Sequence, residues 1–233
     1  MVTWPMPLLD ITNLTKSFVS PDGERSVIVD VPSFTLEAGE QVALQGSSGS
    51  GKTTFLNLIA GILQADSGQI ILAGQNISQM PEADRDLARA NHLGYVFQTF
   101  NLLQGYSALE NVALGMMFGP GADYAHARQL LERVGLKDRV NYRPRQMSVG
   151  QQQRVAVARA LANRPKLVLA DEPTGNLDYR SAKESLALIR EVCRENGAAL
   201  LLVSHDRDVL KQFDKVQDLA AINRAASVET KHV

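Results

Sequence analysis

This 233-residue chain has little cysteine and no large excess of charge of either sign. Cys193 is the single cysteine, which excludes an internal disulfide and fits a reducing compartment. The 24 basic and 25 acidic side chains leave a net charge of −1, so the basic excess that is typical of nucleic-acid binders is lacking. We therefore expect no nucleic-acid partner.

Long apolar runs are scarce as well. The longest strongly apolar run, residues 198–203, is far shorter than the roughly 18 residues that a membrane-spanning helix needs. The first residues carry no charged segment and have Asp10 within their apolar stretch, which is a poor match to a signal peptide. We expect a soluble chain whose membrane role, if it has one, depends on a partner.

What the sequence does contain is the composition of a globular protein, with 45% hydrophobic and 21% charged residues. Apolar patterning predicts strands that alternate with helices, and such alternation favours a parallel sheet covered by helices. From 99 to 146 a helical pattern takes over, which predicts a helical insertion. The strands are expected over 8–18, 27–36, 41–45, 69–73, 94–97, 167–170 and 200–203, and the helices over 52–63, 151–162 and 181–195.

A glycine-rich loop lies between the expected strand 41–45 and the expected helix 52–63. It reads GSSGSGKT and matches the phosphate-loop pattern G-x-x-x-x-G-K-[ST]. Glycines let successive N–H groups turn towards an anion, and the helix that follows adds its own unpaired N–H groups. The residues that we expect to bind ATP here are Gly46, Ser47, Ser48, Gly49, Ser50, Gly51, Lys52, Thr53 and Thr54, with the Thr53 hydroxyl also ligating Mg²⁺.

Two acids follow the apolar strand LVLA at residues 167–170. Ligands of parallel sheets bind at the carboxyl ends of the strands, so Asp171 and Glu172 are expected beside the phosphate loop. Asp171 would hold Mg²⁺ through water, and Glu172 would polarise the water that attacks the γ-phosphorus.

A further segment separates the classes of phosphate-loop protein. Residues 147–154 read MSVGQQQR and resemble the signature motif of ATP-binding-cassette (ABC) ATPases. Gln98 after GYVF, Asp178 within NLD and His205 after ALLLV match further motifs of that family in the same order, and Phe18 matches its adenine-stacking aromatic. The resemblance covers residues 8 to 215.

The resemblance implies a fold and a set of roles. The fold is an α/β phosphate-loop ATPase with a parallel core sheet, an N-terminal antiparallel β subdomain and a helical insertion. Glu172, His205 and Gln98 would be catalytic, with Gln98 joining Thr53 and Asp171 at Mg²⁺. Phe18 and Asp178 would bind nucleotide. We expect one domain over 1–233, with a nucleotide-binding core at 1–98 and 151–215, a helical subdomain at 99–150 and a C-terminal extension at 216–233.

The family mechanism also implies a dimer. Two copies would pack head to tail around two ATP molecules, and Ser148, Gly150 and Gln151 would reach the γ-phosphate held by the other copy. Position 149 departs from the family pattern, because valine stands where glycine is expected. We predict that Ser148 caps the following helix and that Val149 has a right-handed helical conformation, in which its Cβ is tolerated.

Within the family, GYVFQTFNLLQGYSALENV and ADEPTGNLD resemble most the lipoprotein-releasing and macrolide-export group. That resemblance implies separately encoded membrane permease subunits, bound through residues 98–106, and a place on the inner face of the cytoplasmic membrane. A signalling ATPase that acts on a membrane partner without moving solute remains an alternative, and a DNA-repair or translation ATPase is a third. The apolar side chains Phe100, Leu102, Leu103 and Tyr106 would either line the permease groove or pack beneath the helical insertion. Residues 116–118 (MMF) are expected in the core.

Overall fold

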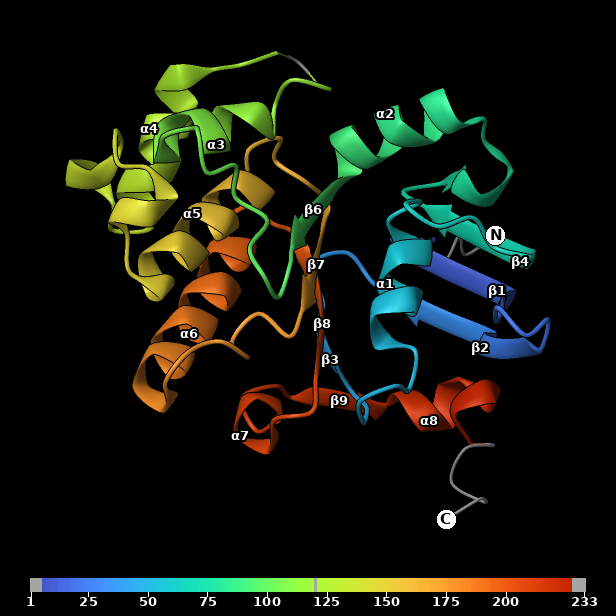
Figure 1. The fold of residues 1–233 in the computed structure, drawn as a ribbon. Helices are drawn as coiled ribbons and strands as arrows, with labels where there is room; N and C mark the ends of the chain where they lie inside the picture. Colours follow the sequence, from blue (N-terminus) through green and yellow to red (C-terminus); the bar gives the residue numbers. More distant parts are fainter. Residues whose placement is uncertain (1–5, 120, 228–233) are drawn as a thin grey trace.

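A computed structural model describes residues 6–119 and 121–227, which form two sheets and the helices around them (Figure 1). The core sheet is parallel, in the order β6-β7-β8-β3-β9, as the alternation of elements predicted. Its strands are β3 Gln41–Gln45, β6 Leu93–Val96, β7 Leu167–Asp171, β8 Ala199–Ser204 and β9 Lys215–Asp218.

The second sheet is antiparallel, in the order β2-β1-β4-β5. Its strands are β1 Leu9–Val19, β2 Arg25–Leu36, β4 Ser67–Leu72 and β5 Gln75–Asn76. The α-helices are α1 Lys52–Ile59, α2 Glu82–His92, α3 Ala108–Leu114, α4 Tyr124–Arg133, α5 Val149–Ala160, α6 Tyr179–Glu195, α7 Arg207–Leu210 and α8 Leu219–Ile222. Short 3₁₀ turns lie at Ile77–Gln79, Lys137–Arg139, Pro144–Gln146 and Arg224–Ser227.

The core sheet is buried on both faces, which explains why β7 and β8 are continuous apolar runs. Along β8, Leu200 and Leu202 pack on one side in a cluster with α3, α4, α5 and α6. Leu201 and Val203 point the other way and pack with α1 and the antiparallel sheet. In Figure 1 the helices α3, α4, α5 and α6 lie to the left of the core sheet, and α1 with the antiparallel sheet lies to its right.

Several sequence-based expectations need correction. The helix expected over 52–63 ends at Ile59, because Gly61 takes a left-handed conformation (φ +66°) that a helix cannot continue through. The MMF run is only partly core: Met116 is buried, but Met117 and Phe118 are exposed. The C-terminal residues, which had no readable pattern, form β9, α8 and a 3₁₀ turn as far as residue 227, and the rest of the expected extension lies outside the described residues.

Four apolar side chains were predicted either to line a permease groove or to pack in the core, and the structure divides them into two pairs. Phe100 and Leu102 are buried beneath the helical layer, whereas Leu103 and Tyr106 are exposed.

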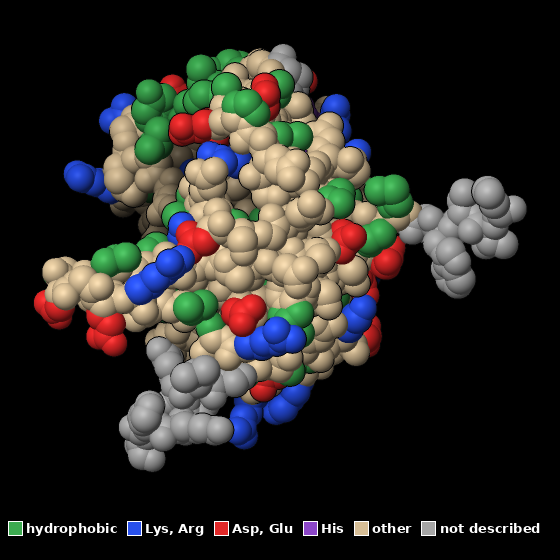
Figure 2. All heavy atoms as spheres, turned by 90° about the vertical axis from the view of Figure 1, so that its right-hand side faces the viewer, with side chains coloured by type: hydrophobic (Ala, Val, Ile, Leu, Met, Phe, Trp, Pro, Cys, Tyr) green, Lys and Arg blue, Asp and Glu red, His purple; other side chains and the backbone are tan. Residues whose placement is uncertain are grey.

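Among the described residues, no helix has the length and apolar character required to cross a bilayer. On the face shown in Figure 2, basic and acidic side chains lie interspersed.

Candidate functional site: the phosphate loop and the strand ends of the core sheet

The phosphate loop connects β3 to α1 and is shaped by glycine. Gly51, the N-cap of α1, has φ +86°, and a Cβ there would lie 2.8 Å from the carbonyl oxygen of Ile28. Only glycine combines that conformation with so close a neighbour. The loop therefore delivers Lys52, the first residue of α1, to the sheet edge with the helix N-terminus exposed towards the same space.

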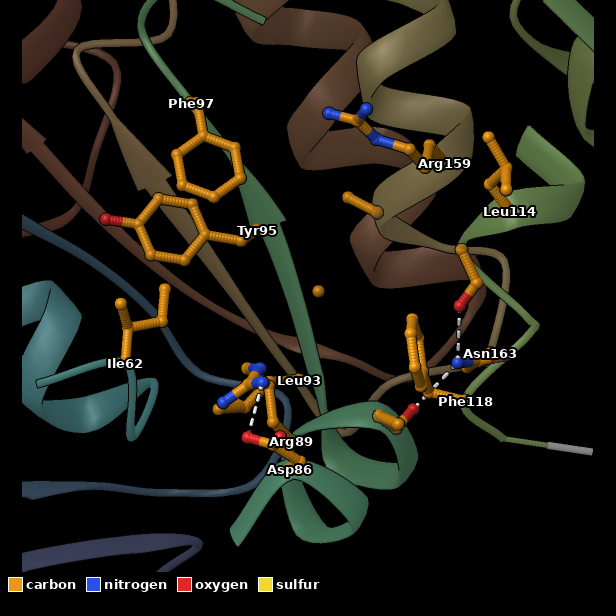
Figure 3. A pocket seen from close by; sticks show the side chains of 14 residues that line it. Ile62, Asp86, Arg89, Leu93, Tyr95, Phe97, Leu114, Phe118, Arg159 and Asn163 are labelled. Carbon is orange, nitrogen blue, oxygen red and sulfur yellow. Dashed lines mark hydrogen bonds and ion pairs between the residues drawn. The ribbon is translucent and has the colours of Figure 1, made fainter. Parts of the chain in front are cut away.

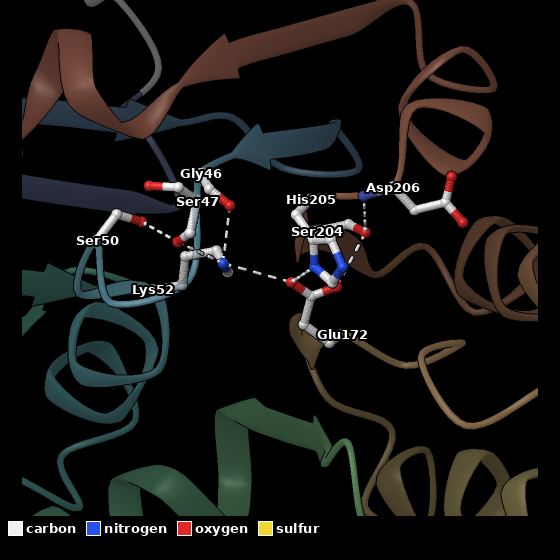
Figure 4. Close-up of polar contacts among 8 residues, drawn as sticks. All are labelled: Gly46, Ser47, Ser50, Lys52, Glu172, Ser204, His205 and Asp206. Atoms are coloured by element: carbon white, nitrogen blue, oxygen red, sulfur yellow. Dashed lines mark hydrogen bonds and ion pairs between the residues drawn. The ribbon is translucent and has the colours of Figure 1, made fainter.

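Lys52 is buried, and its ammonium group folds back over the loop. Its Nζ donates to the carbonyl oxygens of Gly46 at 2.7 Å and Ser47 at 2.8 Å (Figure 4). The same Nζ lies 3.4 Å from Oε1 of Glu172. A buried ammonium needs such partners, and a phosphate would supply stronger ones.

A cavity of ≈ 310 Å³ gathers most of the expected site residues. It is lined by Ile28, Ser48, Gly49, Gly51, Lys52, Thr53, Thr54, Gln98, Asp171, Glu172 and His205. The loop, the end of β6, the end of β7 and the end of β8 thus converge on one space, as expected for ligand sites at the carboxyl ends of parallel strands.

Glu172 is the most constrained residue of this cavity. Its backbone has φ +43°, a conformation that costs a residue with a side chain on the order of 1–3 kcal/mol. Its Oε1 lies 2.6 Å from Nδ1 of His205, and its Oε2 accepts a hydrogen bond from the Ser204 hydroxyl at 3.0 Å (Figure 4). The backbone and the side chain are therefore both fixed, which holds the carboxylate in a single orientation next to Lys52.

Asp171 precedes Glu172 and is also buried. Burial raises the pKa of its carboxyl and the neighbouring charge of Glu172 adds to this, while a hydrogen bond with Thr53 and the charge of Lys52 oppose the rise. The charged form of Asp171 is therefore not fully compensated by its neighbours. The Thr53 hydroxyl and the Gln98 side chain line the same cavity and offer further oxygen ligands. Hard oxygen donors of this kind suit Mg²⁺, so the residues present fit that ion.

The remaining expected residues lie outside this cavity. Phe18 is 43% exposed on β1, with Nζ of Lys16 5.7 Å from the centre of its ring. Ser148 is the N-cap of α5 and its hydroxyl accepts from the N–H of Gln151, so the predicted cap is present. Val149 is the first helical residue and has no left-handed backbone, which agrees with the prediction. Asp178 caps α6.

Three residues around the cavity were missed by the sequence analysis. Ile28 lines the cavity from β2, Ser204 bonds Glu172, and Asn223 reaches the loop from the C-terminal segment. Ser204 directly precedes His205, so its position was the one available signal. Ile28 and Asn223 belong to no motif, and only the fold brings them here.

A second hollow lies beside Phe97, the residue before Gln98, and none of residues 98–106, where the permease contact was expected, lines it. It measures ≈ 300 Å³ and is lined from α2, β6, α3 and α5, and from the segments that follow α1, β6 and α3, by residues that include Tyr95, Phe97 and Phe118 (Figure 3). The rings of Tyr95 and Phe97 stack 4.0 Å apart. Asp86, Arg89 and Arg159 add charge to this apolar groove.

Comparison with known proteins places this site in a family. The family model for ABC transporters matches residues 29–175. The lipoprotein-releasing system ATP-binding protein LolD 2 of Rhodospirillum rubrum is 45% identical, covering 92% of this chain and 94% of its own length. The macrolide export ATP-binding/permease protein MacB of Rhodopirellula baltica is 42% identical over 90% of this chain, which corresponds to 31% of that longer protein.

Solved structures agree. The ATP-binding cassette MJ0796, described as dimeric in a post-hydrolysis state bound to ADP and Pi, superposes with a TM-score of 0.82 at 32% identity, covering 90% of this chain and 93% of that chain. A second dimeric structure of the same cassette, a bacterial ABC transporter cassette, gives 0.82 at 33% identity over the same shares of the two chains. The chain therefore belongs to the ABC transporter family and is an ABC-type ATPase related to LolD and MacB.

Proposed function

We propose that this ATPase drives separately encoded membrane permease subunits of the lipoprotein-releasing or macrolide-export type, from the cytoplasmic face of the membrane. The observation that carries the proposal is the placement of two consecutive residues. Phe97 lines the apolar groove, whereas Gln98 lines the cavity that holds the phosphate loop. A permease helix in the groove would contact Phe97, and a nucleotide in the cavity would contact Gln98. Movement at one site would therefore be passed directly to the other.

The cavity residues divide the work of hydrolysis. Lys52 and the N–H groups of the loop hold the β- and γ-phosphates, and the Lys52 ammonium exchanges at least one of its carbonyl partners for phosphate oxygen. Thr53, Asp171 and Gln98 would hold Mg²⁺, which neutralises phosphate charge when bound. Phe18 would stack on adenine.

Glu172 is assigned the role of general base, which polarises the water that attacks the γ-phosphorus. Ser204 and His205 hold its carboxylate in place, and Oε1 would be free to accept a hydrogen bond from a water once Lys52 moves to phosphate. The water oxygen bonds the γ-phosphorus, the bond from that phosphorus to the β-phosphate oxygen breaks to release ADP, and the proton that Glu172 takes from the water passes to the departing phosphate. His205 is two-thirds exposed, which leaves its ring free to reach the γ-phosphate as well.

The site is completed by a second copy of the chain. Ser148, Gly150 and Gln151 lie at the start of α5, away from the cavity of their own subunit, where N–H groups at a helix N-terminus favour an anion. The head-to-tail homodimer would bring them, with Asp178, to the γ-phosphate held by the partner. The helical subdomain, residues 99–150, would carry Ser148 and Gly150 together with one wall of the groove, and Gln151 would follow at its boundary with the core.

The groove provides the test. Wild type and two variants are co-expressed with the candidate permease, purified from detergent-solubilised membranes, and compared for bound permease and for ATPase activity. Phe118→Asp places a charge on a 79% exposed groove residue, and Val216→Asp is a control on a 41% exposed residue of β9. We expect Phe118→Asp alone to lose the permease, with its own ATPase activity retained.

A permease that binds all three proteins equally would contradict the groove assignment. If the purified assembly contains a multi-spanning protein but moves no solute when reconstituted, the signalling alternative replaces transport. Co-purification of nucleic acid or ribosomes in its place would overturn both.

A further inference from the structure

Asn223 is a fully buried polar residue that no motif of the ATP site includes. It follows α8 and is 1% exposed. Its Nδ2 donates to the carbonyl oxygens of Ile28 at 2.9 Å and Ser50 at 3.3 Å. Its Oδ1 accepts from the N–H groups of Asp30 at 2.7 Å and Ala225 at 3.3 Å. Every donor and acceptor of the side-chain amide is therefore used.

The partners of Asn223 belong to two parts of the fold. Ser50 is in the phosphate loop, directly before Gly51. Ile28 and Asp30 lie on β2, an edge strand of the antiparallel sheet. The amide thus occupies the open edge of β2 as a neighbouring strand would, and bonds the loop with the same group.

Ile28 is a special position on that strand. Lys16 of β1 pairs with Val29 and Ser17 pairs with Val27, so Ile28 has no partner residue on β1 and forms a β-bulge. The next pair along the ladder is Phe18 with Ser26. The bulge held by Asn223 therefore lies beside the strand segment that carries the adenine platform.

We propose that Asn223 is a positioning residue for nucleotide, because it fixes the distance between the Phe18 platform and the phosphate loop. ATP must reach both at once, so a loosened bulge would weaken binding without altering the groups that carry out hydrolysis. This inference depends on ATP binding in the cavity and not on the permease.

The test compares Asn223→Ala with Asn196→Ala. Asn196 is an exposed control that also follows a helix, α6, and its amide bonds a carbonyl oxygen, that of Val192 at 2.7 Å, outside the residues that line the cavity. We expect Asn223→Ala to raise the KM and the Kd for ATP about tenfold, equivalent to about 1.4 kcal/mol, with kcat within about twofold of wild type. Asn196→Ala should leave KM, Kd and kcat unchanged.

A double-mutant cycle with Phe18→Ala separates positioning from general destabilisation. Once the Phe18 ring is removed, its distance from the loop no longer matters. The increase in Kd of the double variant should therefore be smaller than the product of the increases in the two single variants. Asn223→Ser, which puts one polar hydroxyl in place of the amide, replaces the alanine variant if the latter fails to fold. A Kd within twofold of wild type, an equal effect in Asn196→Ala, or effects that multiply fully with Phe18→Ala would each overturn the proposal.

Discussion

Two serines of this chain cap helices in the same way, and only one of them is assigned to the ATP site. Ser148 Oγ accepts from the N–H of Gln151 at 3.3 Å, and the Gln151 side chain accepts from the Ser148 N–H at 3.0 Å. Ser107 and Glu110 repeat this reciprocal pair at the start of α3, at 3.3 and 2.7 Å. Serine-to-alanine substitution removes this cap bond at both positions, and at Ser107 it also removes a hydrogen bond that the hydroxyl donates to Oε2 of Glu110 at 2.7 Å.

Both variants are predicted to lose the stabilisation of the N-cap, and Ser107→Ala loses the bond to Glu110 in addition. Loss of an N-cap hydroxyl costs about 1 kcal/mol of unfolding free energy. For a chain of this size that lowers the Tm by roughly 2–4 °C. Differential scanning calorimetry should show a Tm shift for Ser107→Ala that is at least as large as the shift for Ser148→Ala.

The predicted activities differ. If the Ser148 hydroxyl reaches the γ-phosphate on the partner subunit, it forms a hydrogen bond to a charged group, worth about 1.5–3 kcal/mol. Its loss lowers ATP turnover by on the order of 10- to 100-fold, whereas Ser107→Ala keeps near-normal turnover below its melting range. Equal activity losses in the two variants would refute the assignment of Ser148 to the partner's nucleotide.

Three other variants test the cavity and its surroundings. Glu172→Gln should bind ATP with near-normal affinity, lower turnover by about 10²–10⁴-fold and accumulate an ATP-bound dimer in size-exclusion chromatography; turnover at the wild-type rate would remove Glu172 from its role. Asp171→Asn should raise the Tm of the nucleotide-free protein at pH 7 while reducing Mg²⁺-dependent turnover, because burial already raises the pKa of this carboxyl and the charged form is disfavoured; a lower Tm would contradict that account. Asp66 accepts from Lys16 and from the Ser17 N–H, which lowers its pKa from 3.8 to about 2. Since the folded-state pKa is depressed, its contribution is full above pH 4 and is lost as the pH falls through 2, so the Tm difference between wild type and Asp66→Asn should be present at pH 7 and vanish near pH 2.

The convergence of the phosphate loop, Asp171 and Glu172 on one cavity could be predicted from the sequence because its signals are local. The loop lies within eight residues between a strand and a helix, and Asp171 and Glu172 directly follow an apolar strand. Strand ends of a parallel sheet meet at one edge whatever the length of the connections. Gln98 and His205 reached the cavity for the same reason.

Other features depend on long-range packing that no short pattern encodes. Tyr95 on β6 and Phe97, which follows that strand, line the groove only because α2, α3 and α5 pack around it. Phe118 has the composition of a core residue but is exposed at the rim. Asn223 contacts the loop from a segment in which no helical or strand period could be recognised, through bonds to Ile28 and Ser50.

The dependence of turnover on protein concentration tests the central claim most directly, because each cavity is proposed to need the start of α5 from another copy. ATP hydrolysis per chain should be measured from nanomolar to micromolar protein at saturating Mg²⁺ and ATP, with the oligomeric state followed by analytical ultracentrifugation. The account predicts that turnover per chain rises with concentration in step with the dimer and approaches zero where the protein is monomeric. A turnover per chain that stays constant down to fully monomeric concentrations would contradict it.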